Sequence, residues 1–213
     1  QYTGVLSTEA TVNENEIEIY VLTDKLDQVK EKAISRERQE QYGLYVEKTH
    51  HRNSGCSMRI RETIAYGHGD EEPTASYEFT MKIRNDESGI QMETNLEADY
   101  DAMQRFKLVA DSALIKMRYN VPAGLAVHEG AVFQVDVFEH KQEEPWVKVD
   151  LELPVDISVD TDTVKEALSA LFPEYQDMVI VYPMDKRDGT PSAKLAKGIM
   201  DKHGSLKGPF NAE

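Results

Sequence analysis

Residues 16–21 read EIEIYV, and this alternation of side-chain type points to the fold class. Ile17, Ile19 and Val21 are apolar, whereas the residues between them are polar or, in one case, a tyrosine. A period of two predicts a β-strand with one apolar and one polar face, because successive side chains of a strand point to opposite sides.

The same pattern recurs along the chain, separated by turns rich in Gly, Pro, Asn and Asp. Further strands are predicted near Leu44 and at residues 57–64, 77–84, 90–98, 114–121, 132–138, 146–153 and 178–182. Helices are predicted at residues 24–40, opened by Asp24 as an N-cap, and at 99–113, 160–176 and 192–202. Sequential strands with few helices between them indicate an α+β protein with an antiparallel sheet.

Composition excludes several classes of protein. Hydrophobic residues make up 40% of the 213 residues and charged residues 30%, a balance typical of a globular chain. The net charge of −15 argues against binding along a nucleic acid, which needs a basic surface. The single cysteine, Cys56, excludes an internal disulfide framework. With no apolar run long enough to span a bilayer and no signal-like start, we expect a cytoplasmic protein without a membrane partner.

The polar faces of the predicted strands are sorted by the sign of their charge. Residues i and i+2 lie roughly 6.5 to 7 Å apart on one face, so a same-sign pair needs a cross-strand partner or a ligand. The basic positions are Arg59 with Arg61, Lys82 with Arg84, and Lys116 with Arg118. The acidic positions are Glu16 with Glu18, Glu93 with Glu97, Asp136, and Asp150 with Glu152.

Two architectures are compatible with these faces. In a β-sandwich the charged side chains would form the solvated exterior. In an antiparallel eight-stranded β-barrel they would line a hydrated interior while the helices pack outside. The sorting by sign favours the barrel, because sandwich exteriors normally mix both charges with Ser, Thr and Gln.

The charged faces suit a phosphate ligand and a metal. Arg and Lys pairs offer several donors to phosphate oxygens. Glu and Asp pairs offer the hard oxygen ligands that Mg²⁺ or Mn²⁺ prefers. The charged faces therefore predict a polyphosphate ligand held together with Mg²⁺ or Mn²⁺.

Seven short motifs, in order along the chain, resemble those of the CYTH or triphosphate tunnel metalloenzyme family. They are EIEIY at 16–20, RIR at 59–61, MKIR at 81–84, ETNLE at 93–97, KMR at 116–118, VDVFE at 135–139 and VDLEL at 149–153, followed by DKRDGTPSAKLAKG at 185–198. The resemblance spans about residues 14–198. It implies a tunnel-shaped barrel over residues 1–183 and a C-terminal helix and tail, 184–213, positioned to close the tunnel.

The resemblance also implies roles for the charged residues and a reaction, the metal-dependent hydrolysis of an inorganic, nucleoside or thiamine triphosphate. The metal ligands would be Glu16, Glu18, Asp150 and Glu152. The substrate-binding residues would be Arg59, Arg61, Lys82, Arg84, Lys116 and Arg118. The catalytic candidates, which would orient the attacking water or ligate metal, are Glu93, Glu97 and Asp136.

One departure from the family pattern leaves alternatives open. Tyr20 stands where the family has a Lys, so a cationic contact is replaced by a phenol that can donate one hydrogen bond. A module that binds a nucleotide or polyphosphate without turnover, and class IV adenylyl cyclase chemistry, are therefore the alternatives. The substrate's identity and the oligomeric state, including a homodimer, are left open by the sequence.

Overall fold

The computed structural model describes residues 7–9, 15–46, 54–67, 71–85, 91–140, 142–154 and 156–211, without the side chains of 7–9, 54, 84–85 and 91–92. The described strands are β1 (Ser7–Glu9), β2 (Glu16–Leu22), β3 (Ser35–Val46), β4 (Ser54–Tyr66), β5 (Thr74–Asn85), β6 (Gln91–Glu97), β7 (Ser112–Pro122), β8 (Val132–Phe138), β9 (Trp146–Glu152), β10 (Asp177–Val181) and β11 (Leu206–Lys207). The helices are α1 (Asp27–Lys32), α2 (Tyr100–Lys107), α3 (Thr161–Ser169), α4 (Pro183–Asp188) and α5 (Pro191–Ile199), with a π-helical turn at Met200–Gly204.

These elements form an antiparallel sheet with a few helices, which confirms the predicted α+β class. The sheet holds eleven described strands rather than eight, because the short strands β1, β10 and β11 add to the longer ones. The strand pairs do not show a closed ring, so closure into a barrel stays a prediction. In the described part of the chain, no helix combines the length and the apolar character that crossing a membrane requires.

The chain divides into two compact units. The first comprises residues 1–12, 39–115 and 205–213, and the second comprises residues 13–38 and 116–204. The divisions fall inside β3 and β7, so each of these strands contributes to both units. The predicted boundary between residues 183 and 184 concerns a different partition and stays a prediction.

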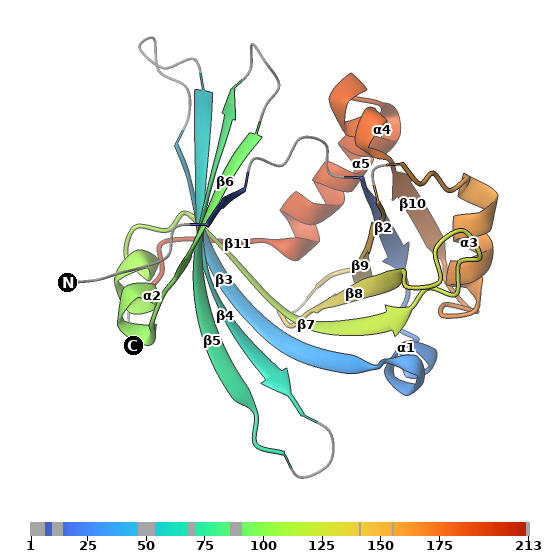
Figure 1. Ribbon diagram of the computed structural model, residues 1–213, viewed down its shortest axis with the longest axis horizontal. Helices are drawn as coiled ribbons and strands as arrows, with labels where there is room; N and C mark the ends of the chain where they lie inside the picture. Colours follow the sequence, from blue (N-terminus) through green and yellow to red (C-terminus); the bar gives the residue numbers. More distant parts are fainter. Residues whose placement is uncertain are drawn as a thin grey trace. The chain divides into compact units, whose positions relative to one another are not determined.

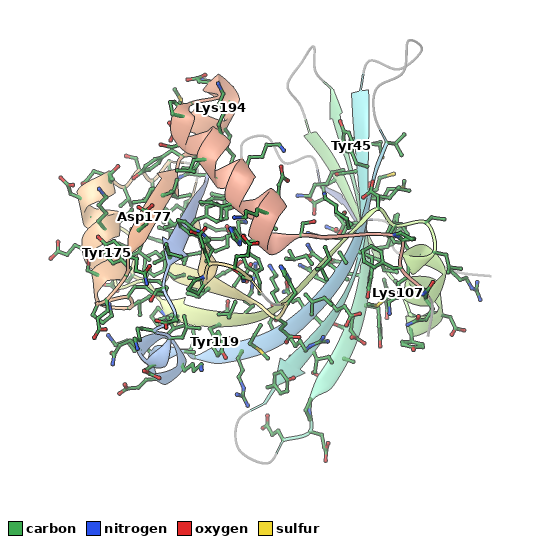
Figure 2. All side chains as sticks on the ribbon, turned by 180° about the vertical axis from the view of Figure 1, so that it is seen from behind. Tyr45, Lys107, Tyr119, Tyr175, Asp177 and Lys194 are labelled. Carbon is green, nitrogen blue, oxygen red and sulfur yellow. The ribbon has the colours of Figure 1, made fainter. Side chains whose placement is uncertain are left out.

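The first unit packs helix α2 on one face of its strands (Figure 1). Ile60 and Met103 are buried in its core, and Asp99 caps α2 by accepting a hydrogen bond from the backbone N–H of Ala102. Lys107, labelled in Figure 2, is also buried at the end of α2, with its ammonium 5.0 Å from the centre of the Tyr42 ring. The aliphatic stem of this lysine thus packs while its charge contacts an aromatic face.

The second unit orders its strands β7, β8, β9, β2 and β10, and the two faces of this sheet differ. One face is wholly apolar: Ile19, Phe133 and Val149 pack against Val164 and Leu168 of α3. On the other face α5 covers β10 and β2 (Figure 1). The rest of that second face carries charged side chains, and it forms the site described below.

The alternation predicted for residues 16–21 is confirmed by this arrangement. Ile17, Ile19 and Val21 are all almost fully buried in the core under α3. Tyr20 points to the opposite face, where it is buried with Val181 and Ala196 instead. A strand with one face against α3 and one against α5 explains why a tyrosine interrupts the polar positions.

The helix predicted at residues 24–40 is wrong beyond residue 32, because β3 begins at Ser35. The Arg, Glu and Gln residues there are good helix formers, but pairing with distant strands overrides that local preference. The change is already visible at Ile34, whose backbone N–H donates to the carbonyl of Asn120. The N-cap position is occupied by Leu26 rather than Asp24, without a side-chain hydrogen bond.

Candidate metal and phosphate site

Three carboxylates meet on the charged face of the second unit, where β2 pairs with β9. The register of this pair sets Glu16 opposite Glu152 and Glu18 opposite Asp150. One carboxylate oxygen each of Glu16, Glu18 and Asp150 lies within 4.8 Å of the other two. The side chains of this carboxylate triad are buried or half-buried, so the strand alternation holds three like charges in a partly desolvated place.

The triad fits a small divalent cation. Two oxygens on opposite sides of Mg²⁺, each about 2.1 Å from it, are ~4.2 Å apart. The three oxygens of the triad lie within 4.8 Å of one another, which is close to that separation. Three carboxylates are also hard oxygen donors, the ligand type that Mg²⁺ and Mn²⁺ select. The cluster could therefore hold a metal ion.

Two lysines contact the triad. Lys148, in β9, lies 2.8 Å from Asp150 and 3.6 Å from Glu18, measured from its Nζ to a carboxylate oxygen. Lys186, in α4, donates a hydrogen bond of 2.6 Å to Oε1 of Glu18. Its side chain is 42% exposed, compared with 17% for Lys148. Lys148 is therefore enclosed by the sheet, whereas Lys186 reaches the triad from outside and can leave it at little cost.

The pKa values of the triad reflect burial and this distribution of charge. Burial, and then the charge of Asp150, raises the pKa of Glu16 to about 7. Burial alone would also raise the pKa of Glu18, but Lys148 and Lys186 hold it below its usual value. Burial disfavours the charge of Lys148, yet Asp150 and Glu18 together hold its pKa above the ordinary value. Lysines therefore compensate the carboxylates of Glu18 and Asp150, whereas among the described residues no lysine makes a close contact with Glu16.

A second charged group on the same face links β7 to β8. Asp136 is 1% exposed and is ion-paired with both Lys116 and Arg118. Arg118 also donates to the side chain of Gln134 at 2.6 Å, and one of its terminal nitrogens lies 3.6 Å from Asp150. Although burial would raise the pKa of Asp136, Lys116 and Arg118 hold it below the usual range. Asp136 thus fixes the guanidinium of Arg118 beside the triad.

The first unit carries the other predicted charges on one face of β4, β5 and β6. Arg61 contacts Glu78 at 2.8 Å, and Lys82 contacts Glu93 at 2.9 Å. Burial would raise the pKa of Glu93, but its hydrogen bond with Lys82 and the charge of Lys82 hold it below the usual value. Arg59 donates to Thr80 at 3.3 Å. The same-sign pairs on single strands are therefore balanced by cross-strand partners.

The structure brings together some of the predicted residues more closely than others. Glu152 lies opposite Glu16 in the register but is exposed and is not one of the three grouped carboxylates. Glu97 is exposed at the end of β6. Arg84 belongs to β5 through its backbone, but its side chain lies outside the described residues. The roles assigned to all of these residues from the sequence stay predictions.

Sequence reasoning missed three partners of the predicted residues. Lys148 alternates with acidic residues on its own strand, a signal that was present in VKVDLEL at 147–153. Glu78 shows its role only through the cross-strand register that sets it opposite Arg61. Lys186 is 168 residues from Glu18 along the chain, so no local pattern could have paired them.

A cavity of about 390 Å³ adjoins the triad. Glu18, Lys148 and Lys186 form its charged end. Side chains of β2, β10, α5 and the following π-helical turn line the remainder, and every lining residue belongs to the second unit. The pocket is thus lined by charged residues of the triad's face and by side chains of α5, among which Lys197 is charged as well.

No family model matches the sequence, and no curated protein matches it. Among solved structures, the PH1819 protein from Pyrococcus horikoshii OT3 is similar at 15% identity over 92% of this chain and 94% of that one, with a TM-score of 0.39. HpAC1 from Hippeastrum, a putative adenylyl cyclase described as having a dominant triphosphatase activity, is similar at 14% identity over 84% and 99%, with a TM-score of 0.43. The Schizosaccharomyces pombe Mediator head module is similar at 10% identity over 78% and 100%, with a TM-score of 0.32. Because all three TM-scores lie below 0.5, these likenesses assign neither a family nor a function.

Proposed function

We propose that the protein binds Mg²⁺ or Mn²⁺ together with a triphosphate and hydrolyses the triphosphate to orthophosphate and a diphosphate product. The observation that carries the proposal is the meeting of Glu16, Glu18 and Asp150 within 4.8 Å, with Lys148 and Lys186 in contact with them. One face thus offers acceptors for a metal ion and donors for phosphate oxygens side by side.

In this proposal the metal ligands are the three grouped carboxylates, with Glu152 as a further candidate. A bound ion would neutralise charge on the phosphates and lower the pKa of a water molecule. The three protein ligands are too few to complete an octahedral shell, which leaves positions for phosphate oxygens and water. That incomplete ligand set is what a metal-dependent phosphohydrolase requires.

The basic side chains of the second unit would bind and orient the phosphates. Lys148 is held by Asp150, so its charge stays in one place. Arg118 is fixed by Asp136 and Gln134 and gives a preorganised positive group. Lys186 is the most exposed of these three side chains, and it would exchange its hydrogen bond to Glu18 for one to a phosphate. Preorganised donors stabilise developing negative charge without reorganisation during the reaction.

Asp136 acts in this proposal as a positioning residue. Its two ion pairs and its near-complete burial leave it surrounded by Lys116 and Arg118. A carboxylate in that environment orients a guanidinium better than it orients water. The roles predicted from the sequence for the charged residues of the first unit stay predictions; these residues are Glu93, Glu97, Arg59, Arg61, Lys82 and Arg84.

A second function, binding without turnover, is favoured by Tyr20. This phenol is 2% exposed and packs with Trp146 and Val179 under α5. Burial raises its pKa, so the phenol stays neutral throughout the accessible pH range. A neutral group at this position supplies no charge to the transition state, although it does not weaken the carboxylate triad.

The experiment is orthophosphate release from tripolyphosphate, ATP, GTP and thiamine triphosphate with Mg²⁺ or Mn²⁺. The double variant Glu16→Gln/Glu18→Gln replaces two carboxylates by neutral amides of nearly the same size, which are much weaker metal ligands. Glu166→Gln, on the exposed side of α3, is the matched control. Metal-dependent release that is lost in the double variant and kept in the control supports hydrolysis. Absence of release from all four compounds, with one of them bound in calorimetry, would reject hydrolysis in favour of binding alone.

A further inference from the structure

A buried histidine lies in the second unit, outside the candidate site. His203 belongs to the π-helical turn Met200–Gly204 that follows α5, and it is only 3% exposed. Its Nε2 lies 3.4 Å from a carboxylate oxygen of Glu144, in the loop between β8 and β9. The side chain of Glu144 is 53% exposed, so the carboxylate keeps much of its hydration. The contact joins an imidazole inside the fold to a charge at the surface.

Glu144 also contacts the tryptophan at the start of β9. The indole N–H of Trp146 donates to Oε2 of Glu144 at 3.3 Å, the same oxygen that faces His203. The backbone N–H of Trp146 donates to the side chain of Gln142 at 3.2 Å, which ties the loop together. The indole itself is buried and packs with Ile199 of α5. One carboxylate therefore connects the turn after α5 to a residue that packs against that helix.

Close packing fixes the position of the turn. A Cβ atom on Gly204 would lie 3.1 Å from Cζ of Phe138, so the backbone of the turn lies directly against β8. A second ion pair, between Lys202 and Glu143 at 3.0 Å, joins the turn to the same loop. Both of its side chains are more than half exposed, so this outer pair contributes little by itself. The contact of His203 is the buried one of the two.

Protonation changes the nature of the buried contact. Histidine is the side chain whose charge ordinarily changes between about pH 5 and 8. A neutral imidazole offers Glu144 at most one N–H donor, whereas an imidazolium also brings the opposite charge. Glu143 and Glu144 place two negative charges at this end of the turn and Lys202 places one positive charge. An imidazolium there is therefore compensated rather than repelled.

Other titratable groups border the same segment at other points. Lys197 and Asp201 pair with each other. The ring of His140, at the end of β8, lies 6.0 Å from the ring of Phe138. Tyr20 of β2 is buried with Trp146 under α5, and its raised pKa keeps it neutral. The charged groups that share the cavity with Met200 and Asp201 are Glu18, Lys148 and Lys186.

We propose that His203 and Glu144 form a pH-sensitive latch, which holds the turn after α5 against the β8–β9 loop when His203 is protonated and loosens when it is neutral. Met200 and Asp201 of that turn line the cavity beside the triad, so the latch sets how firmly this part of the cavity wall is held. The inference goes beyond the proposed hydrolysis and does not depend on it, because the contact involves no ligand.

Trp146 reports on the latch, because it is the only tryptophan in the sequence and it donates to Glu144. Quenching of its fluorescence by acrylamide, a neutral molecule, is measured on the full chain at about pH 5.5 and about pH 8. We expect the quenching constant to be greater at the higher pH by about twofold or more, because a loosened loop exposes the indole more often. His203→Gln should remove this difference. His140→Gln, the matched control, should keep it.

A second variant covers the case in which His203→Gln does not fold, judged by its circular dichroism. Glu144→Gln changes a half-exposed side chain, removes its charge and keeps an acceptor for the indole N–H, and it should also make quenching equal at the two pH values. Wild-type quenching that is independent of pH, or stronger at the lower pH, would overturn the inference. A difference that survives in Glu144→Gln, or one that is lost in His140→Gln, would overturn it as well. Orthophosphate release judges the proposed function separately.

Discussion

Replacing Asp136 by Asn should cost the protein a large part of its stability. The carboxylate is 1% exposed, and the side chains of its partners Lys116 and Arg118 are only 7% and 13% exposed. An amide of the same shape cannot compensate either charge, and its NH₂ group would face a cation. Removing one member of a buried ion pair costs about 3–5 kcal/mol, and two cations are left here, so we expect the upper part of that range.

The measurement is equilibrium unfolding in urea. The slope of the unfolding free energy against urea concentration is compared between variant and wild type, because an unchanged slope means that only stability has changed. The double variant Asp136→Asn/Lys116→Met is the decisive companion, because it removes one unpaired charge as well. It should regain most of the loss, since Arg118 keeps Gln134 and Asp150. The account of the buried charges would be refuted if the free energy of unfolding of the single variant lay within about 1 kcal/mol of the wild-type value. It would also be refuted if the double variant were no more stable than the single variant.

Three further predictions concern Asp136, the apolar core of the second unit and Lys186. Asp136 has a lowered pKa in the folded protein, so its contribution to stability is present above the unfolded-state pKa near 4 and is lost as the pH falls toward the folded value. When unfolding is measured at decreasing pH, Asp136→Asn should therefore lose less free energy of unfolding below pH 4 than wild type does. Phe172→Ala empties a fully buried position under α3 and should cost about 3–5 kcal/mol in urea unfolding, while a loss below 1 kcal/mol would mean that the core refills. Lys186→Met removes an ammonium that contacts Glu18 and should tighten Mn²⁺ binding several-fold in calorimetry, whereas unchanged or weaker binding would exclude competition between the lysine and the metal.

The polar and apolar faces of single strands could be predicted from the sequence because alternation is a local property. β8 begins and ends at the predicted residues, and β9 ends one residue earlier than predicted. The cap of α3 was also predictable, since Asp160 accepts a hydrogen bond from the backbone N–H of Thr163. Each of these features depends on residues within a few positions of one another.

The candidate site could be predicted only in part. Its acidic members were readable as same-face pairs on β2 and β9. That Glu16, Glu18 and Asp150 meet, whereas Glu152 stays outside the group, depends on the antiparallel register and on side-chain orientation. The sequence contains no signal for either.

Local pattern by itself determined which side chains share a face and that charges are sorted by sign, because these follow from a repeat of two residues. The antiparallel sheet was indicated by the order of the strands, which follow one another with few helices between them. Tertiary structure alone decided that residues 35–40 form a strand, since pairing with distant strands outweighs the weak helix preference of Arg, Glu and Gln. It also decided that Lys186 reaches Glu18 and that α5 and Tyr20 line one cavity. Each of these arrangements joins segments more than 150 residues apart, and such a meeting is fixed by packing rather than by any local repeat.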